Sequence, residues 1–367
     1  MEKKISMLDS MKGIAILMVV MIHTGAANLP SVLGKIGAAG RTGVQIFFIV
    51  SGILTMKSYE NYKLNGGGPG VWLMRKVIRL VPLYFIAIFS YTFICGGFSG
   101  WLGSEENVTI GNVITHLFFI HGLFPHYANS IIGVEWYIGT LFIYYLLTPI
   151  LYKICKGIER TMCIFMISTL ICTITINILC KTVIDVVDAE IYYGYFATFS
   201  PLAQFPVYML GILIYNMIYK SLVLKNVKNK ALFSGSMLIF ALTILAGNIL
   251  GMNQIKGITN YTLYGIVYAF IIISMYISKV VIVDNCIFNF IGKNSYGIYL
   301  IHMMVINLYE KNVKVDLNIK TWIIKYIIIF GISLVGAIII NKCIEKPISA
   351  LFNKQLRNYE KIQLRKE

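Results

Sequence analysis

The stretch ISMLDSMKGIAILMVVMIHTGAA (residues 5–27) is long and apolar enough to cross a membrane, yet it contains Lys12 and His23. A transmembrane helix needs about 20 mostly apolar residues, and ionisable side chains within one are costly. A helix turns about 100° and rises about 1.5 Å per residue, so Lys12 and His23 share nearly one face, about 16 Å apart along the axis. Ionisable residues inside a membrane usually face a polar cavity, so this pair predicts a functional site.

The composition extends this interpretation to the whole chain. Of its 367 residues, 57% are hydrophobic and only 13% are charged, whereas soluble domains carry about 25% charged residues. Ten apolar runs are long enough to span and, with short loops, use the full length. We therefore predict an all-α polytopic membrane protein, a single domain over residues 1–367 with no appended soluble domain. The predicted spans are residues 5–27, 42–57, 77–96, 133–152, 162–181, 197–219, 231–250, 259–279, 286–309 and 321–343.

The charges of the loops give the spans a direction. A further apolar run is too short to cross alone, and we predict an outer half-helix there, near residues 111–124. Both termini and the basic segments then lie in the cytoplasm, and the acidic segments 105–106 and 185–190 lie outside, as the positive-inside rule requires. Two predicted outer loops, residues 251–258 and 310–320, carry lysine against this rule. The strongly basic segments are residues 57–76, 153–160, 220–230 and 342–366.

The net charge of +16 does not indicate a nucleic-acid-binding protein. Lysine and arginine form short clusters between apolar runs instead of one basic surface, and the positive-inside rule explains that distribution. A metal site is not expected either. His116, His121 and His126 are five positions apart, a spacing that does not place consecutive imidazoles on one helical face.

Four cations gather at the predicted cytoplasmic ends of the first and third spans. Lys12 stands in the first, and Arg75, Lys76 and Arg79 begin the third. Such a cluster binds phosphate through charge-assisted hydrogen bonds, and the pantetheine arm of coenzyme A is long enough to reach from there toward His23. An unperturbed imidazole titrates near pH 6.5, so His23 is a candidate general base for an acceptor hydroxyl. The alternatives are cations that only snorkel to the interface and a histidine that is a buried hydrogen-bond donor.

Several motifs occur in order along the chain and carry a resemblance to a known family. The first span has a basic residue and a histidine separated by ten residues, and it is followed by GVQIFFIVSGIL (residues 43–54), RKVIRLVPLYF (75–85), GKNSYGIYLIH (292–302) and EKP (345–347). Together they resemble the bacterial membrane acyltransferase family 3, whose members O-acylate cell-surface glycans. Relatives more often have arginine where this chain has Lys12, and their Ser-Gly pair, here Ser51-Gly52, permits close helix approach.

The resemblance implies an integral membrane O-acyltransferase of the bacterial cytoplasmic membrane. It would move an acyl group, most simply acetyl, from cytoplasmic acyl-coenzyme A to a hydroxyl of a cell-surface polysaccharide or its lipid-linked precursor. No bound cofactor is implied, since acetyl-coenzyme A is a substrate. The implied residues are His23 for catalysis, Lys12, Arg75, Lys76 and Arg79 for the donor, and Glu135, Trp136, Tyr296, Tyr299 and His302 for the acceptor.

One position departs from the family pattern. Where relatives often have a glutamate after the motif tryptophan, here Trp136, this chain has Leu141, and Glu135 precedes the tryptophan instead. The partner of His23 is therefore open at this point. An alternative function is a transporter or flippase of a small solute with His23 as proton relay, although no internal repeat of the kind common in transporters is evident.

Overall fold

The computed structural model describes residues 6–95, 108–183, 188–250, 259–278, 284–314 and 316–363, and every regular element in these ranges is helical, which confirms the all-α prediction. The predicted outer segments 105–106 and 251–258, and part of the acidic segment 185–190, lie outside the described residues. The helices are α1 (Ser6–His23), α2 (Ser31–Ala39), α3 (Gly43–Leu64), α4 (Pro69–Ser90), α5 (Ile110–Leu117), α6 (Trp136–Ile154), α7 (Ile158–Thr182), α8 (Ala189–Gly194), α9 (Pro201–Tyr215), α10 (Lys230–Leu250), α11 (Asn260–Ser278), α12 (Cys286–Lys293), α13 (Ser295–Asn312), α14 (Ile319–Ile340) and α15 (Lys346–Gln363).

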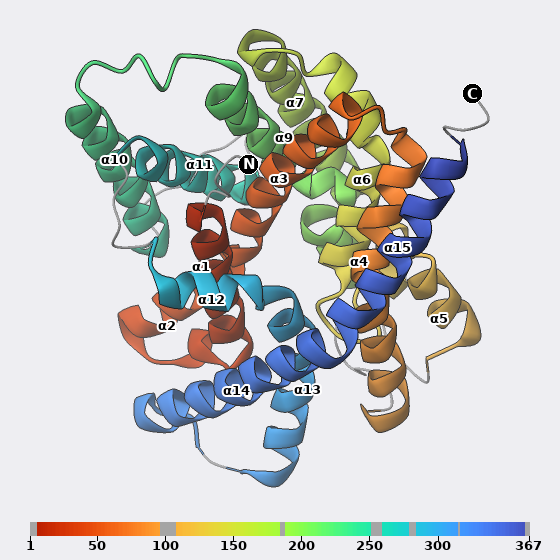
Figure 1. Ribbon diagram of the computed structural model, residues 1–367. Helices are drawn as coiled ribbons and strands as arrows, with labels where there is room; N and C mark the ends of the chain where they lie inside the picture. Colours follow the sequence, from red (N-terminus) through yellow and green to blue (C-terminus); the bar gives the residue numbers. More distant parts are fainter. Residues whose placement is uncertain are drawn as a thin grey trace.

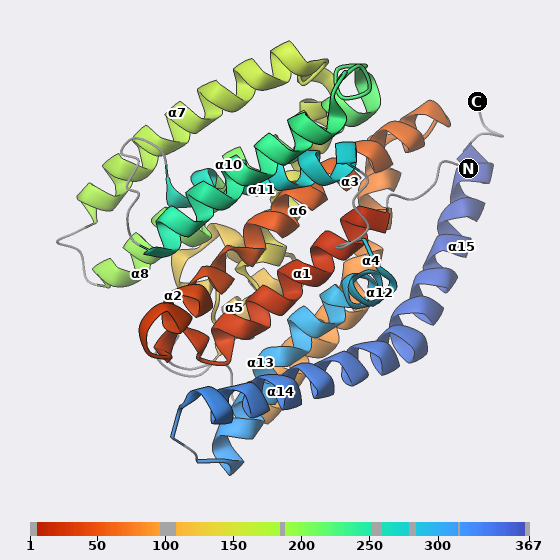
Figure 2. The same ribbon diagram turned by 90° about the vertical axis from the view of Figure 1, so that its left-hand side faces the viewer.

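Nine helical segments within the described ranges are long and apolar enough to cross a membrane, which confirms a polytopic membrane protein. The remaining predicted span, residues 286–309, is divided into α12 and α13 by a break at Asn294. The 18-residue α13 packs against α1, α4 and α14, so it belongs to the helical bundle. In Figure 2, the first turn of α1 and the last turn of α15 lie on the same side of the molecule.

The break at Asn294 follows from a close contact between α12 and α1. A Cβ atom at Gly13 would collide with the carbonyl oxygen of Phe288, and one at Gly292 would collide with the carbonyl oxygen of Asp9. The two backbones therefore touch at positions where only glycine fits. The end of α12 is held against α1 by this contact, and the chain turns at Asn294 to begin α13.

A second close contact joins α3 to α9 at the Ser-Gly pair of the second span. A Cβ atom at Gly52 would lie 2.6 Å from the carbonyl oxygen of Tyr208, and one at Gly211 would collide with the carbonyl oxygen of Ile49. The packing of α3 on α9 and on α1 leaves α3 mostly buried. α1 and α3 thus lie together inside the bundle, where their polar side chains have little contact with lipid.

Other helices form the periphery of the bundle. α7, α10 and α14 lie at its outer edges in Figure 1 and expose large apolar side chains such as Leu170, Ile239 and Ile327. Extended apolar surface of this kind marks contact with lipid. The segment between α4 and α6 does not form a long helix in its described part. It contains the short α5 and two single 3₁₀ turns at His121–Leu123 and Pro125–Tyr127.

Candidate active site

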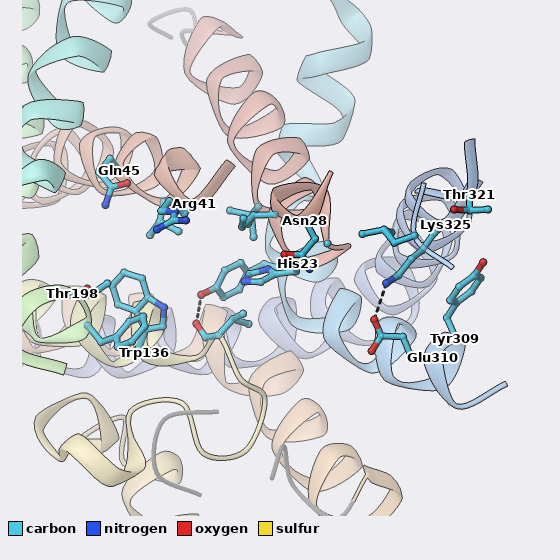
Figure 3. A pocket seen from close by; sticks show the side chains of 18 of the residues that line it. His23, Asn28, Arg41, Gln45, Trp136, Thr198, Tyr309, Glu310, Thr321 and Lys325 are labelled. Carbon is cyan, nitrogen blue, oxygen red and sulfur yellow. Dashed lines mark hydrogen bonds and ion pairs between the residues drawn. The ribbon is translucent and has the colours of Figure 1, made fainter. Parts of the chain in front are cut away.

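A cavity of about 780 Å³ surrounds His23 at the end of α1, and we call it the histidine cavity. Its volume falls within the range of about 300–1,000 Å³ that is usual for small-molecule sites. Figure 3 shows His23 between two groups of side chains, one from the α3, α6 and α9 side and one from α13 and α14. The lining residues labelled there include Arg41, Gln45, Trp136, Thr198, Glu310 and Lys325.

His302 is the partner of His23. The Nδ1 atom of His23 lies 3.0 Å from Nε2 of His302, and Nδ1 of His302 lies 2.8 Å from the carbonyl oxygen of Tyr299. A carbonyl oxygen only accepts hydrogen bonds, so His302 carries its proton on Nδ1, and neutral His302 accepts at Nε2. His23 then donates from Nδ1 and has its lone pair on Nε2, the tautomer that a general base for a cavity ligand requires.

A smaller cavity of about 160 Å³ surrounds three of the predicted donor-binding cations, and we call it the lysine cavity. Lys12, Lys76 and Arg79 all line it, together with Lys293 from the end of α12. Nζ of Lys12 also lies 2.8 Å from Oδ1 of Asp9, which is buried. The remainder of the lining is largely apolar and aromatic, so this cavity suits a narrow chain beside a group of positive charges.

The fourth predicted cation, Arg75, lies in a neighbouring open hollow of about 580 Å³, the basic cleft. Lys76 and Arg79 line the basic cleft as well as the lysine cavity, so the two adjoin. Lys57 adds a further cation. Aromatic rings hold two of these side chains by cation–π contacts: Arg75 lies 5.2 Å from the ring centre of Tyr62, and Nζ of Lys76 lies 5.5 Å from that of Trp72.

Tyr299 lines both the histidine cavity and the lysine cavity. Its ring centre lies 5.7 Å from that of Tyr137 and 6.4 Å from that of Phe47, and both of these rings face the lysine cavity. The hydroxyl of Tyr137 lies 2.9 Å from Oγ of Ser51. We call Phe47, Tyr137 and Tyr299 the aromatic partition, because Tyr299 lines both cavities and the other two rings contact it on the side of the lysine cavity.

Glu135 does not line either cavity. Its fully buried carboxylate accepts hydrogen bonds from the backbone N–H groups of residues 131–134, at 2.7–3.1 Å. Nε2 of His116 lies 3.2 Å from Oε1 of the same carboxylate. The loop thus fixed presents the carbonyl oxygen of Val134 to the hydroxyl of Tyr299, which donates a hydrogen bond to it. The sequence suggested acceptor binding for Glu135, but its contacts are those of a residue that positions the loop beside Tyr299.

His116, near the end of α5, and His121, in the turn that follows it, pack together instead of surrounding an open site. The rings of His116 and His121 stack with centres 4.2 Å apart. Burial, and then the neighbouring His116, lower the pKa of His121 well below its usual value of 6.5, so this imidazole is neutral at physiological pH. Within the described ranges, no group of three or more histidine, cysteine or acidic side chains has a geometry suited to a metal ion.

The remaining predicted acceptor residues have separate positions. Trp136 lines the histidine cavity. Tyr296 lines the lysine cavity, and its hydroxyl donates to the carbonyl oxygen of Leu80 at 2.9 Å. His302 is fully buried behind His23. Leu141 faces the lysine cavity, so the position where relatives often have a carboxylate lies on the other side of the aromatic partition from the histidine cavity.

Many lining residues were not predicted from the sequence, and for two of them the sequence contained a usable signal. Lys293 belongs to the GKNSYGIYLIH motif and lies inside the predicted span 286–309, and a cation within an apolar run was a usable signal. Gln45 lies in the otherwise apolar stretch GVQIFFIV and is almost completely buried at the wall of the histidine cavity. An amide inside an apolar span is costly unless it is hydrogen-bonded, which marks such a residue for attention.

Comparisons with known proteins place the chain in a family. It is 22% identical over 369 residues to a protein of Caenorhabditis elegans described as "Regulator of hypoxia-inducible factor 1", a match that covers 84% of this chain and 72% of the relative. No solved structure matches. The family model described as "Acyltransferase domain" matches residues 5–342, which include every residue named above for both cavities and the basic cleft. The protein is therefore a member of this family, a multi-pass membrane acyltransferase of the acyltransferase 3 type.

Proposed function

We propose that this acyltransferase moves an acetyl group from acetyl-coenzyme A, bound from the cytoplasm, to a hydroxyl of a cell-surface polysaccharide or its lipid-linked precursor. The observation that carries the proposal is the position of Tyr299, which faces both the cation-lined cavity and the cavity of His23. A donor on one side and an acceptor on the other would meet at this side chain.

The donor side matches the shape and charge of coenzyme A. Its phosphates would bind in the basic cleft to Lys57, Arg75, Lys76 and Arg79 through charge-assisted hydrogen bonds. Its narrow, largely uncharged pantetheine arm would occupy the lysine cavity, whose 160 Å³ excludes the nucleotide. The thioester at the end of the arm would then reach Tyr299. Binding of the phosphates far from the reacting carbon would hold the thioester in place for reaction.

The acceptor side supplies the base. Nε2 of His23 takes the proton of the acceptor hydroxyl while the hydroxyl oxygen attacks the thioester carbonyl carbon. The bond between carbon and sulfur then breaks, and the leaving thiolate takes the proton from His23, so the products are an O-acetyl ester and free coenzyme A. His302 keeps His23 in the reactive tautomer and accepts a hydrogen bond from Nδ1 throughout. The enclosed site limits hydrolysis of the thioester by water.

Transfer of a labelled acetyl group tests this proposal. The full chain, purified in detergent or nanodiscs, is incubated with [¹⁴C]acetyl-coenzyme A and a crude cell-envelope glycan fraction, and label is counted in alkali-labile ester. We expect wild-type protein to label the glycan and His23→Ala to reduce labelling by at least about 10²-fold, the lower end of a general-base contribution. His126→Ala is the matched control, since this histidine does not line either cavity.

The alternative of a transporter gives a different result. In proteoliposomes, a transporter would move a solute across the bilayer without acetyl-coenzyme A, and no label would reach the glycan. That outcome, or full activity of the His23→Ala variant, would contradict the proposed reaction.

A further inference from the structure

We propose that the acceptor is an anionic glycan, one whose sugar bears a phosphate or a carboxylate, and that the cations of the histidine cavity bind this group. The inference rests on the proposed function, because it concerns the second substrate of the same reaction. The cations are Arg41, Lys314 and Lys325, which come from three separate segments of the chain.

The charges lining the histidine cavity are unbalanced. Among the described residues that line it, Glu310 is the only acidic one, against three cations. Oε1 of Glu310 lies 2.7 Å from Nζ of Lys325, so this carboxylate is already engaged, as Figure 3 shows. Among the described residues, no carboxylate forms an ion pair with Arg41 or Lys314. A cavity with uncompensated positive charge attracts and orients an anion.

The distribution of lysine along the sequence supports the same conclusion. The predicted outer loop 310–320 carries lysines that oppose the positive-inside rule, and the topology gives no reason for them. The structure places Lys314, from this loop, and Lys325, from the following helix, at the wall of the histidine cavity. Binding of an anionic acceptor from the outer side gives these cations a function that membrane insertion does not.

The carbohydrate part of the acceptor has a separate contact. Nε2 of Gln204 donates to the carbonyl oxygen of Thr198 at 2.7 Å, so Oε1 of Gln204 accepts from Nε2 of Gln45, at 3.1 Å. This chain fixes the orientation of the Gln45 amide and leaves its buried Oε1 without a hydrogen-bond partner among the described residues. A buried acceptor without a donor is costly. A sugar hydroxyl in the histidine cavity supplies the missing donor, and Trp136 offers its ring to a sugar face there.

Matched acceptors test the charge of the substrate. Transfer of [¹⁴C]acetyl is compared for methyl N-acetylglucosaminide, which is neutral, methyl glucuronide, which carries a carboxylate, and N-acetylglucosamine 1-phosphate. We expect at least one of the charged acceptors to exceed the neutral one on the order of tenfold in kcat/KM, with the advantage falling as salt rises. Preference for phosphate over carboxylate, or the reverse, identifies the anion. Equal or better transfer to the neutral sugar would overturn the proposal.

Paired variants localise the effect. Arg41→Ala combined with Lys314→Ala is expected to remove the advantage of the charged acceptor and to leave the KM for acetyl-coenzyme A unchanged. Lys311→Ala combined with Lys320→Ala is the control, since it removes the same charge from residues that do not line the cavity. Equal losses in the two double variants would contradict the assignment. Gln45→Leu should instead weaken transfer to neutral and charged acceptors alike.

A binding measurement separates failure of this inference from failure of the proposed function. The dissociation constants of the three sugars are measured with the full chain by microscale thermophoresis, without acetyl-coenzyme A. Tighter binding of a charged sugar, lost in the Arg41→Ala and Lys314→Ala double variant, supports the anionic site even if no transfer occurs. Transfer to glycan with no preference for charge, in binding or in turnover, supports the acyltransferase reaction and overturns the anionic acceptor.

Discussion

His302 holds His23 through a hydrogen bond between two imidazoles, with Nδ1 of His23 3.0 Å from Nε2 of His302. Because backbone carbonyl oxygens fix the proton of His302 on Nδ1, the pair has a defined direction of donation. In many enzymes a carboxylate orients the catalytic histidine in this way. Here the ring of His302 is the partner of His23, and Leu141 lines the lysine cavity instead.

Substitution of His302 should therefore lower kcat with little change in the KM for either substrate. We expect His302→Leu to reduce kcat by about 10²-fold or more, since the tautomer of His23 is no longer fixed. His302→Gln keeps an oxygen that accepts from Nδ1 and should recover part of the loss. The acidic limb of the pH–rate profile should also move in His302→Leu, a change that loss of packing alone would not produce.

Removal of cations from the lysine cavity should weaken binding of the donor. Arg79→Ala and Lys293→Ala are expected to raise the KM for acetyl-coenzyme A on the order of tenfold each, with a smaller change in kcat, because each loses a charge-assisted contact. Lys12→Ala should also lower the melting temperature, since Asp9 loses its ion pair. Lys156→Ala, in a basic loop away from the cavities, is the control. An unchanged donor KM in Arg79→Ala and Lys293→Ala would contradict the donor assignment.

Truncation of Tyr299 should uncouple thioester cleavage from acyl transfer. Tyr299→Ala opens the aromatic partition and admits water to the thioester, so hydrolysis of acetyl-coenzyme A without acceptor should rise on the order of tenfold. Tyr299→Phe keeps the ring and loses only the hydrogen bond to Val134. Free coenzyme A, measured with a thiol reagent, gives the rate. Equal hydrolysis by both variants would argue against a barrier formed by the ring.

Glu135 provides a test between acceptor binding and loop positioning. Glu135→Gln replaces an oxygen that accepts from backbone N–H groups with a donor, and we expect a loss of about 3 kcal/mol in the free energy of unfolding. The melting temperature in detergent reports this loss. Glu159→Gln makes the same chemical change at an exposed site and should have no such effect. A raised acceptor KM at normal stability would favour direct acceptor binding by Glu135 instead.

The contact between α1 and α12 can be tested with a single methyl group. Gly292→Ala would place Cβ against the carbonyl oxygen of Asp9, and the resulting shift of α12 should cost about 1–3 kcal/mol and lower the melting temperature. Gly331→Ala, on α14, meets no atom within 4 Å and should be neutral or stabilise by up to about 1 kcal/mol. A neutral Gly292→Ala would contradict the close contact.

The helical bundle was predictable because lipid leaves few choices for the backbone. Runs of about 20 apolar residues identify crossings whatever their neighbours are. The break at Asn294 was not predictable in the same way, since it depends on Gly292 meeting Asp9, a residue far away in the sequence. The hydropathy of a segment indicates whether lipid or water surrounds it, but not which other backbone segment packs against it.

The same distinction applies to the site: one part of it was predictable from the sequence and another part was not. The helical period predicts Lys12 and His23 on one face, and in the structure each of them lines a cavity that Tyr299 also lines. The separation of those cavities was not predictable, because the partition combines rings from α3, α6 and α13. The position of Glu135 was missed for a related reason: four backbone N–H groups converge on its carboxylate only after the loop has folded.

The aromatic partition also determines how the proposed reaction responds to membrane voltage. In the proposed reaction the acyl group moves from the donor toward the outer side, and a proton moves from the acceptor hydroxyl to the leaving thiolate. Counted as an acylium cation and a proton, the two groups carry equal charges in opposite directions. In the proposed reaction the phosphates of the donor would stay with the cations of the basic cleft and would not cross the membrane field with the acyl group. A membrane potential acts on net displaced charge, at about 2.3 kcal/mol per elementary charge and 100 mV. Turnover should therefore proceed at the same rate in energised and de-energised membranes, driven by the thioester alone.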